Sequence, residues 1–355
     1  MIDINFASLR LIGLTHTITN ELVTFADAAP DARLMRVAEV HRDAIVLHDG
    51  AQTCQARQRS RLLQSLDAQQ TSLAVGDWVL VDCVAVGTHW IGARIPPQTQ
   101  LARRSADGSR QPLASNVDTA LLVMGLDRDF NPRRLERYIA LAHAALVDAV
   151  VVLTKADIGI AVDERMAQLR QRLPASVPLM ALNALDAQQT RSMLAPWLDA
   201  GQTLVLLGSS GAGKSTLTNT LCASAQPTGG VRKGDGRGRH TTTARSLHQF
   251  AGGACIIDTP GLRSWRLDAE EDALTAAFDD IDALARNCQF RDCHHQAEPG
   301  CAVRDAVDAD RLFNYHKLLR EVRRSQQTPL DRIAERAKWK VLLKTVGPRS
   351  RSKRA

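Results

Sequence analysis

The stretch TLVLLGSSGAGKSTLTNT, residues 203–220, decides the fold of the domain around it. The apolar run Leu204–Leu207 ends at Gly208, the segment GSSGAGKS follows, and helix-compatible residues come after Ser215. This order of strand, G-x-x-x-x-G-K-S and helix is typical of a phosphate-binding P-loop. A glycine-rich turn between an unrelated strand and helix is the plainer alternative, but both flanks and the spacing favour the P-loop.

The residue types of this loop suit a nucleoside triphosphate. Glycines let backbone N–H groups turn towards phosphate oxygens, where a Cβ atom would obstruct them, and the following helix adds its positive end. Lys214 can neutralise the β- and γ-phosphates, and Ser215 can bind Mg²⁺. We predict phosphate contacts from Gly208, Ser209, Ser210, Gly211, Ala212, Gly213, Lys214, Ser215 and Thr216.

Composition indicates a globular protein of two or three domains. The chain has 355 residues, 45% of them hydrophobic, and a mean hydropathy of −0.18. No apolar stretch approaches the ~20 residues that span a bilayer, and the N-terminus lacks the features of a signal peptide. We therefore expect a cytoplasmic protein with no membrane partner.

The charge distribution favours a polyanionic partner. The net charge is +7 and the pI is near 9.2. From Arg336 to the end the chain carries basic residues and no acidic one. Such a tail is attracted to phosphate backbones or anionic lipid. A solvated tail that only confers solubility is the alternative, and the sequence does not choose between them.

Residues 1–112 are predicted to form an all-β domain. The segment 32–50 alternates apolar and polar residues and ends in Asp49-Gly50, a hairpin signal. Short strands with basic residues among them indicate a small barrel of the oligonucleotide-binding (OB) type, or one used only for packing or protein contact. The polar segment 103–112 marks the domain boundary. Further strands are predicted at 53–63, 73–82 and 89–96.

Residues 113–267 change to alternating strands and helices, which indicates a parallel, doubly wound sheet. The P-loop strand and helix join this sheet. Strands are predicted at 116–127, 148–157 and 177–184, and helices at 132–146 and 164–173.

A base-reading tetrad, Thr154-Lys155-Ala156-Asp157, follows one of these strands. The Asp157 carboxylate can accept two hydrogen bonds from guanine, whereas adenine would leave it unpaired. The aliphatic part of Lys155 can pack over the base. Because α/β folds bind ligands at the carboxyl ends of strands, the tetrad favours GTP over ATP. The turn Asn183-Ala184 is predicted to complete the base contact.

Two further segments are predicted to meet the γ-phosphate. In CIIDTPG, Asp258 would hold Mg²⁺ through water and the N–H of Gly261 would meet the phosphate. GDGRGRHTTT, residues 234–243, suits a switch loop, with a mobile surface loop as the alternative. We assign its Mg²⁺ contact to Thr242, although Thr241 and Thr243 remain open.

The order of these motifs is rotated. In ordinary GTPases the P-loop comes first and the base-reading tetrad later, whereas here the tetrad precedes the P-loop. We therefore predict a circularly permuted G domain. Circular permutation is tolerated when the original chain termini lie close together on the surface. Because DTPG then ends the domain, γ-phosphate loss is hypothesised to move Gly261 and Leu262 and to pass that shift to the third domain.

Leu262 stands where many GTPases have a glutamine that orients water. We therefore expect slow turnover by the protein alone. His240 is the candidate catalytic residue, with a phosphate or RNA contact as its alternative role, or else a partner orders the site. Replacement of His240 by alanine is expected to reduce stimulated turnover far more than GTP binding.

Residues 268–355 are predicted to form a helical, metal-binding domain with a basic tail, with helices at 268–287 and 308–325. Of seven cysteines, Cys288, Cys293 and Cys301 cluster around His294 and His295. Three thiolates and one imidazole make a closed, structural Zn²⁺ site. From spacing alone either histidine can be the fourth ligand.

With rotated motifs, a preceding β domain and a following Cys/His module, the chain resembles the RsgA (YjeQ) family of ribosome small-subunit-dependent GTPases. The resemblance covers nearly the whole chain. One departure is Asn183-Ala184, where the family often has Ser-Ala, although the N–H of Ala184 can still meet the guanine oxygen. The resemblance is carried by TKAD, GSSGAGKS, GRHTTT, DTPGLRSW and Cys-x4-Cys-x-His-x5-Cys with EPG before the last cysteine.

The resemblance implies an N-terminal OB-fold, a permuted G domain and a zinc-binding C-terminal domain. It implies the zinc ligands Cys288, Cys293, His295 and Cys301, which selects His295. It also implies a GTP hydrolase that binds the 30S subunit and its 16S rRNA, is stimulated there, and assists late 30S maturation. We expect a monomer that uses Mg²⁺ with GTP. The alternatives are a permuted GTPase of another RNA or protein assembly, and an RNA-binding scaffold that the nucleotide only stabilises.

Overall fold

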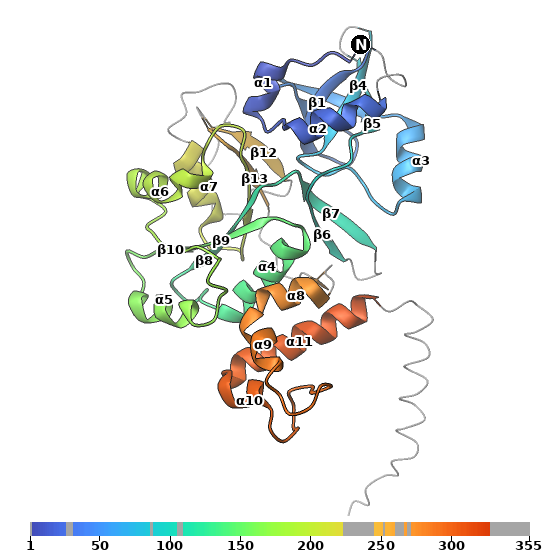
Figure 1. The fold of residues 1–355 in the computed structure, drawn as a ribbon. Helices are drawn as coiled ribbons and strands as arrows, with labels where there is room; N and C mark the ends of the chain where they lie inside the picture. The colour runs from blue at the N-terminus through green and yellow to red at the C-terminus, as the bar shows by residue number, and fades with distance from the viewer. Residues whose placement is uncertain are drawn as a thin grey trace, which may run out of the picture.

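The computed structural model describes residues 2–25, 31–85, 88–104, 109–222, 245–250, 253–259, 266–267 and 271–326. His240, Thr242, Gly261, Leu262 and the basic tail lie outside these ranges, so the expectations placed on them stay predictions. Figure 1 shows the N-terminal barrel, the central sheet domain and the C-terminal helices as successive parts of the molecule.

The N-terminal domain is a closed five-stranded barrel. Its strands follow the order β1-β2-β3-β5-β4, and β4 pairs back to β1. Met35, Val37 and Ile91 are buried inside it because alternate residues of a strand share one face. The strands are β1 (Arg33–Val40), β2 (Ile45–His48), β3 (Thr53–Gln58), β4 (Trp78–Ala85) and β5 (Thr88–Arg94).

The all-β expectation was wrong for two parts of this domain. α1 (Phe6–Leu11), α2 (His16–Glu21) and η1 (Leu22–Phe25) precede the barrel. The segment 53–63, predicted as one strand, ends its strand at Gln58 and enters α3 (Ser60–Ala68). Leu62 and Leu66 of α3 are four residues apart and both are buried in the barrel core, which is the spacing of a helix face.

A small second sheet follows the barrel. β6 (Gln100–Arg104) and β7 (Arg110–Ser115) pair as an antiparallel hairpin, and β14 (Arg266–Leu267) pairs with β6. The predicted domain boundary at residue 112 therefore falls within β7. The polar residues of the segment 103–112 belong in part to these paired strands.

The central domain is a doubly wound sheet in the order β10-β9-β8-β11-β13-β12, parallel except for β12. The apolar residues of α4 and α5 pack on one face, and those of α6 and α7 pack on the other. The strands are β8 (Thr119–Gly125), β9 (Asp148–Thr154), β10 (Leu179–Ala181), β11 (Thr203–Leu207), β12 (Ser246–Gln249) and β13 (Cys255–Asp258). The helices are α4 (Pro132–Ala144), α5 (Val162–Arg170), α6 (Ala187–Leu194), η2 (Ala195–Trp197) and α7 (Lys214–Cys222).

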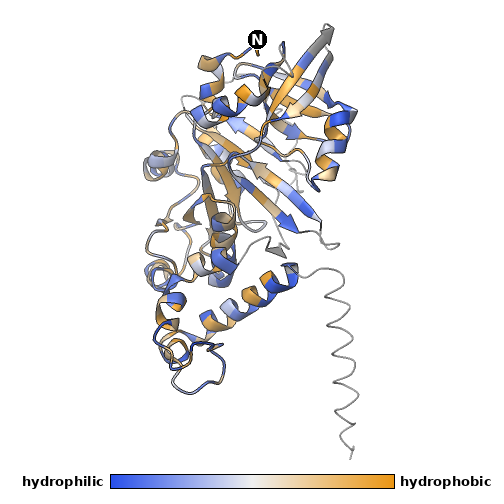
Figure 2. Ribbon diagram, turned by 45° about the vertical axis from the view of Figure 1, so that its right-hand side comes forward, coloured by the Kyte–Doolittle hydropathy of each residue, from blue (hydrophilic) through white to orange (hydrophobic). Residues whose placement is uncertain are grey.

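Hydropathy follows this arrangement. Figure 2 shows orange, hydrophobic residues gathered in the strands of the central sheet, whereas the C-terminal helix α11 alternates blue and orange along its length. β8 is buried at every position, as expected for a parallel strand with helices on both faces. α11 by contrast is an amphipathic helix on the outside of the protein.

The barrel and the central sheet are joined through β1. β12 pairs with β1 at Ser246 and Glu39, so one continuous sheet runs through both domains. Arg36 of β1 is fully buried at this junction. Its guanidinium donates to Thr203 Oγ1 at the start of β11 (2.9 Å) and to the carbonyl of Asn116 (2.8 Å).

The C-terminal domain is helical: α8 (Glu271–Ala277), α9 (Asp279–Ala285), α10 (Ala302–Ala306) and α11 (Ala309–Gln326). The helix predicted at 268–287 is two helices, because Phe278 leaves the helical conformation and caps α9. Phe278 is fully buried and packs edge-on against the ring of Tyr315 in α11. Among the described residues, no helix is both long and apolar enough to cross a bilayer.

Candidate nucleotide site and metal centre

The P-loop lies between β11 and α7, as predicted. A Cβ atom at Gly208 would lie 2.3 Å from the carbonyl oxygen of Val123 in β8, so only glycine lets the loop pass there. Gly213 has a φ of +97°, in the left-handed region that side chains avoid. The glycines therefore fix both the path and the turn of the loop.

Lys214 is buried beneath the loop. Its ammonium donates to the carbonyls of Gly208 (2.9 Å) and Ser209 (2.8 Å). Burial lowers the pKa of Lys214, while the nearby carboxylates of Asp258 and Asp129 raise it. Burial also raises the pKa of Asp258, at the end of β13, and the Lys214 charge opposes that shift. A cation and an acidic group thus lie together beside the loop, as a phosphate–metal site requires.

The base-reading tetrad contacts the P-loop directly. Thr154 Oγ1 donates to the carbonyl of Ala212 (2.6 Å), and Lys155 Nζ donates to the carbonyl of Gly211 (2.8 Å). Asp157, the last residue of the tetrad, is exposed. The tetrad and the P-loop are therefore in contact, although 50 residues lie between Asp157 and Gly208 in the chain.

The turn Asn183-Ala184 lies beside the tetrad. β9 and β10 pair in parallel, and the N–H of Ala156 donates to the carbonyl of Leu182 (3.3 Å). The Asn183 side chain accepts from the N–H of Leu185 (3.0 Å), which shapes the turn. The carbonyl of Ala184 accepts from Thr220 in the P-loop helix (2.7 Å). Asparagine at position 183 thus supplies the turn with its own hydrogen bond.

Two acidic residues of the site were missed from the sequence. Asp127 Oδ2 accepts from Lys155 Nζ (2.7 Å), and Asp129 Oδ1 accepts from Ser209 Oγ (2.5 Å). They follow β8, at and just beyond the end of the strand predicted at 116–127, and no site role was predicted for either. Their position at the carboxyl end of a parallel strand, next to the predicted tetrad and P-loop, was the available signal.

The predicted metal ligands converge. One ligand atom each from Cys288, Cys293, His295 and Cys301 lies within 4.8 Å of all the others. His295 Nδ1 is 3.6 Å from the Cys288 sulfur and 3.5 Å from the Cys301 sulfur. Tetrahedral zinc, with bonds of about 2.3 Å to sulfur and about 2.0–2.1 Å to nitrogen, would set these atoms about 3.5 Å apart. The four residues fit that ion.

Glu298 shapes the metal loop. Its carboxylate accepts from the backbone N–H groups of His294 (3.0 Å), Gln296 (2.8 Å) and Ala297 (3.0 Å). The backbone N–H of Glu298 itself, followed by those of Gln296, His294 and Ala297, lowers the pKa of Glu298 to about 2. His294 is exposed, whereas His295 is buried and has a φ of +58°. The Glu298 contacts hold the turn that directs His295, and not His294, towards the thiols.

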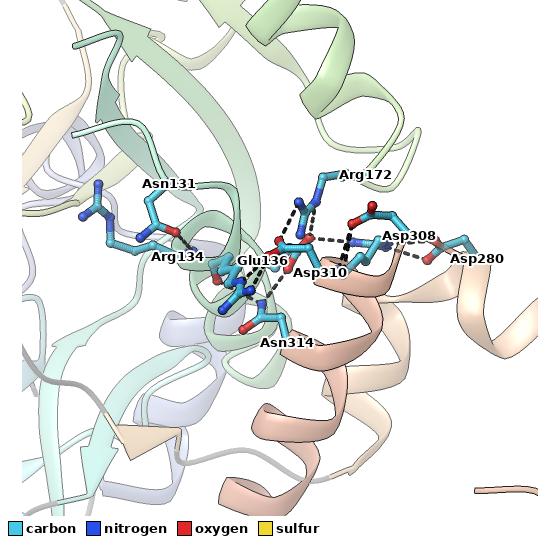
Figure 3. A network of polar contacts seen from close by, with 10 residues as sticks. Asn131, Arg134, Glu136, Arg172, Asp280, Asp308, Asp310 and Asn314 are labelled. Atoms are coloured by element: carbon cyan, nitrogen blue, oxygen red, sulfur yellow. Dashed lines mark hydrogen bonds and ion pairs between the residues drawn. The ribbon is translucent and has the colours of Figure 1, made fainter. Parts of the chain in front are cut away.

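A polar network joins the central domain to the C-terminal helices (Figure 3). Glu136 of α4 is fully buried and accepts from Arg172 (2.9 Å), Arg311 (2.9 Å) and Asn314 (2.5 Å). Arg311 also donates to Asp280 at the start of α9 (2.9 Å). The buried negative charge of Glu136 and the positive charges of its arginine donors offset each other's cost of desolvation. The network therefore fixes α11 on α4.

Known proteins match nearly all of this chain. A family model described as RsgA GTPase matches residues 95–268. The "Small ribosomal subunit biogenesis GTPase RsgA" of Xanthomonas oryzae pv. oryzae (strain PXO99A) is 44% identical over 327 residues, covering 88% of this chain and 87% of that one. The protein of the same name from Xanthomonas axonopodis pv. citri (strain 306) is 43% identical, with the same coverage.

Two solved structures share the fold. The crystal structure of YjeQ from Thermotoga maritima has a TM-score of 0.61 at 24% identity and covers 82% of this chain and 98% of that chain. YloQ, described as a circularly permuted GTPase, has a TM-score of 0.55 at 21% identity and covers 84% and 97%. The predicted fold class is confirmed: a closed barrel, a permuted G domain and a helical domain with a Cys/His cluster.

Proposed function

This chain belongs to the RsgA GTPase family, and on that premise we propose that it binds the 30S ribosomal subunit and assists its late maturation. As a member of that family it hydrolyses GTP to GDP and phosphate. Its relatives carry the name of small ribosomal subunit biogenesis GTPases. The net charge of +7 supports an RNA-rich partner such as 16S rRNA. We place this activity in the cytoplasm, with the protein acting as a monomer.

The observation that carries the nucleotide assignment is the contact between the base-reading tetrad and the P-loop. Thr154 and Lys155 bond the loop carbonyls, so one ligand can reach both segments. We assign the phosphates to the loop, the guanine edge to Asp157 and the guanine oxygen to the N–H of Ala184. The assigned GTP-binding residues are Thr154, Lys155, Ala156, Asp157, Asn183, Ala184, residues 208–216, Asp258 and Gly261.

Mg²⁺ is assigned to the Ser215 hydroxyl, to Asp258 through water and to Thr242. An acidic group and a hydroxyl beside the buried Lys214 are the donor set that a hydrated Mg²⁺ takes with a triphosphate. When bound, the ion neutralises charge that builds on the phosphates. The chain's own part is to orient the nucleotide, with Lys214 at the β- and γ-phosphates.

We assign one structural Zn²⁺ to Cys288, Cys293, His295 and Cys301. Their convergence and S–N distances near 3.5 Å support this choice. Four protein ligands leave no open position, so the ion would hold the C-terminal loop together and take no part in hydrolysis.

The test is GTP turnover with 30S subunits, with 50S subunits and with neither. We expect 30S subunits alone to raise turnover, because no water-orienting glutamine follows DTPG. The variant His240→Ala should lose most of that stimulation and keep its GTP affinity. Equal turnover under all three conditions would contradict the ribosomal role and favour a different RNA or protein assembly as the partner.

A further inference from the structure

The segment that follows β8, residues 127–129, is connected to the P-loop by hydrogen bonds at two places. The Ser209 hydroxyl donates to Asp129 Oδ1 (2.5 Å). Lys155 Nζ lies between Asp127 Oδ2 (2.7 Å) and the carbonyl of Gly211 (2.8 Å), so Asp127 reaches the loop through Lys155. Residues 127–129 thus bind the second position of G-x-x-x-x-G-K-S directly, through Asp129, and the fourth position indirectly, through Lys155.

This acidic segment is itself held in place. The backbone N–H of Asp129 donates to Asp127 Oδ1 (3.0 Å), and that of Gly125 donates to Asp129 Oδ2 (3.1 Å). Arg134, in the first turn of α4, donates to Asp129 Oδ1 (2.5 Å) and to the Asp129 carbonyl. α4 is in turn capped by Asn131 and begins with Pro132. The backbone and the side chain of Asp129 are therefore both held by hydrogen bonds, so this residue is a fixed support for the P-loop.

An acidic group beside a phosphate site would ordinarily repel the ligand. Here the Asp129 carboxylate is largely buried, with 15% of its side chain exposed, and is paired with Arg134. Asp127 is likewise paired with Lys155. Both carboxylates are thus compensated by cations, and they can accept hydrogen bonds from the loop without leaving net negative charge at the site.

We propose that Asp129 is a positioning residue that acts through Ser209 to hold the P-loop ready for the β-phosphate, which GTP and GDP share. The inference rests on the proposed assignment of this loop as the phosphate site. A loop that is already ordered loses less conformational entropy when the nucleotide binds. Removal of the Asp129–Ser209 hydrogen bond should therefore weaken both nucleotides alike. Turnover at saturating GTP should change little, because the bond is the same in the ground and transition states.

The experiment measures GDP and GTP affinity, KM and kcat for Ser209→Ala, Asp129→Ala and the double variant. Each single change should weaken both nucleotides about tenfold, the scale of a hydrogen bond to a charged group, while kcat stays within about threefold. The double variant should bind no more weakly than Asp129→Ala, because both changes remove one contact. Additive losses, wild-type affinity in the single variants, or a fall in kcat alone would each overturn the proposal.

Matched variants separate this role from a loss of folding. Ser209→Thr restores the hydroxyl and should bind both nucleotides more tightly than Ser209→Ala does. Arg137→Ala removes an ion pair of the same helix with Glu321, on the side of the C-terminal domain, and should leave affinity unchanged. Lys214→Ala should abolish binding. If Lys214→Ala instead binds normally, the phosphate site itself is misassigned, whereas normal binding by Ser209→Ala alone refutes only the role of Asp129.

Discussion

Under the proposed assignment, selection of the base depends on Asp157. It is exposed at the end of a tetrad whose first two residues are anchored to the P-loop, so its carboxylate is free to meet a base edge while its backbone is fixed. A carboxylate accepts two hydrogen bonds and donates none at neutral pH. Only a base with two adjacent donors satisfies it.

Replacement of Asp157 by asparagine should therefore change the nucleotide that the protein prefers. The amide offers one donor and one acceptor, which mismatches guanine and matches xanthine, where an oxygen replaces the exocyclic amine. We expect GTP affinity to fall by at least about a hundredfold and XTP affinity to rise, measured by competition binding. Unchanged GTP affinity would show that the base lies elsewhere.

The two adjacent histidines provide a matched pair for the metal centre. His295 is buried among the thiols and His294 is exposed. We expect His295→Ala to lose the bound zinc, and His294→Ala to retain one ion per chain, as measured by elemental analysis of the purified proteins. Equal zinc content in the two variants would contradict the ligand assignment.

At the scale of elements, α4 is the helix that contacts both the segment beside the P-loop and the C-terminal helices. Arg134 in its first turn supports Asp129 beside the P-loop, and Glu136 in its second turn binds the C-terminal helices through Arg311. Arg172, which follows the helix after the tetrad, joins the same carboxylate. In the described part of the chain, α4 thus links the proposed nucleotide site to the C-terminal helices. The link predicted through Gly261 and Leu262 lies outside the described residues.

Glu136→Gln should weaken the hold of α11 on the central domain. The change removes the charge that compensates two buried guanidinium groups, and breaking a buried pair in this way costs about 3–5 kcal/mol. We expect lower stability in urea and faster hydrogen exchange in α11. Arg286→Ala, which breaks a solvent-exposed pair with Asp282, is the control and should cost about 0.5 kcal/mol or less. Equal effects of both changes would rule out a special role for the Glu136 network.

At the scale of the whole molecule, what could be predicted from the sequence divides by distance along the chain. The P-loop, the tetrad and the cysteine spacing are local patterns, and the structure places the tetrad against the P-loop and brings the three cysteines together with His295. Arg36 and Thr203 are 167 residues apart, and Arg311 and Glu136 are 175 apart. Neither contact can be predicted from the neighbouring sequence. A charged residue is normally expected at the surface, so its burial is not predicted until its partner is known.

The same reasoning explains the smaller errors. Segment 53–63 contains the β-compatible run of β3 and the two leucines of α3, and only burial of Leu62 and Leu66 in the closed barrel decides for a helix. Asp129 was missed because its partner Ser209 is 80 residues away. Tertiary contacts, which single-sequence patterns do not contain, decided these cases.

The rotated strand order also has a consequence in time. β8, β9 and β10 are neighbours in the sheet and leave the ribosome before β11, so they can pair while β11 is still being synthesised. β11 must then insert beside β8 to bring the P-loop next to these strands, and β13, which ends in Asp258, pairs with β11 last. A nascent chain of this protein therefore completes the proposed GTP site only when its last parallel strand, β13 with Asp258, has emerged.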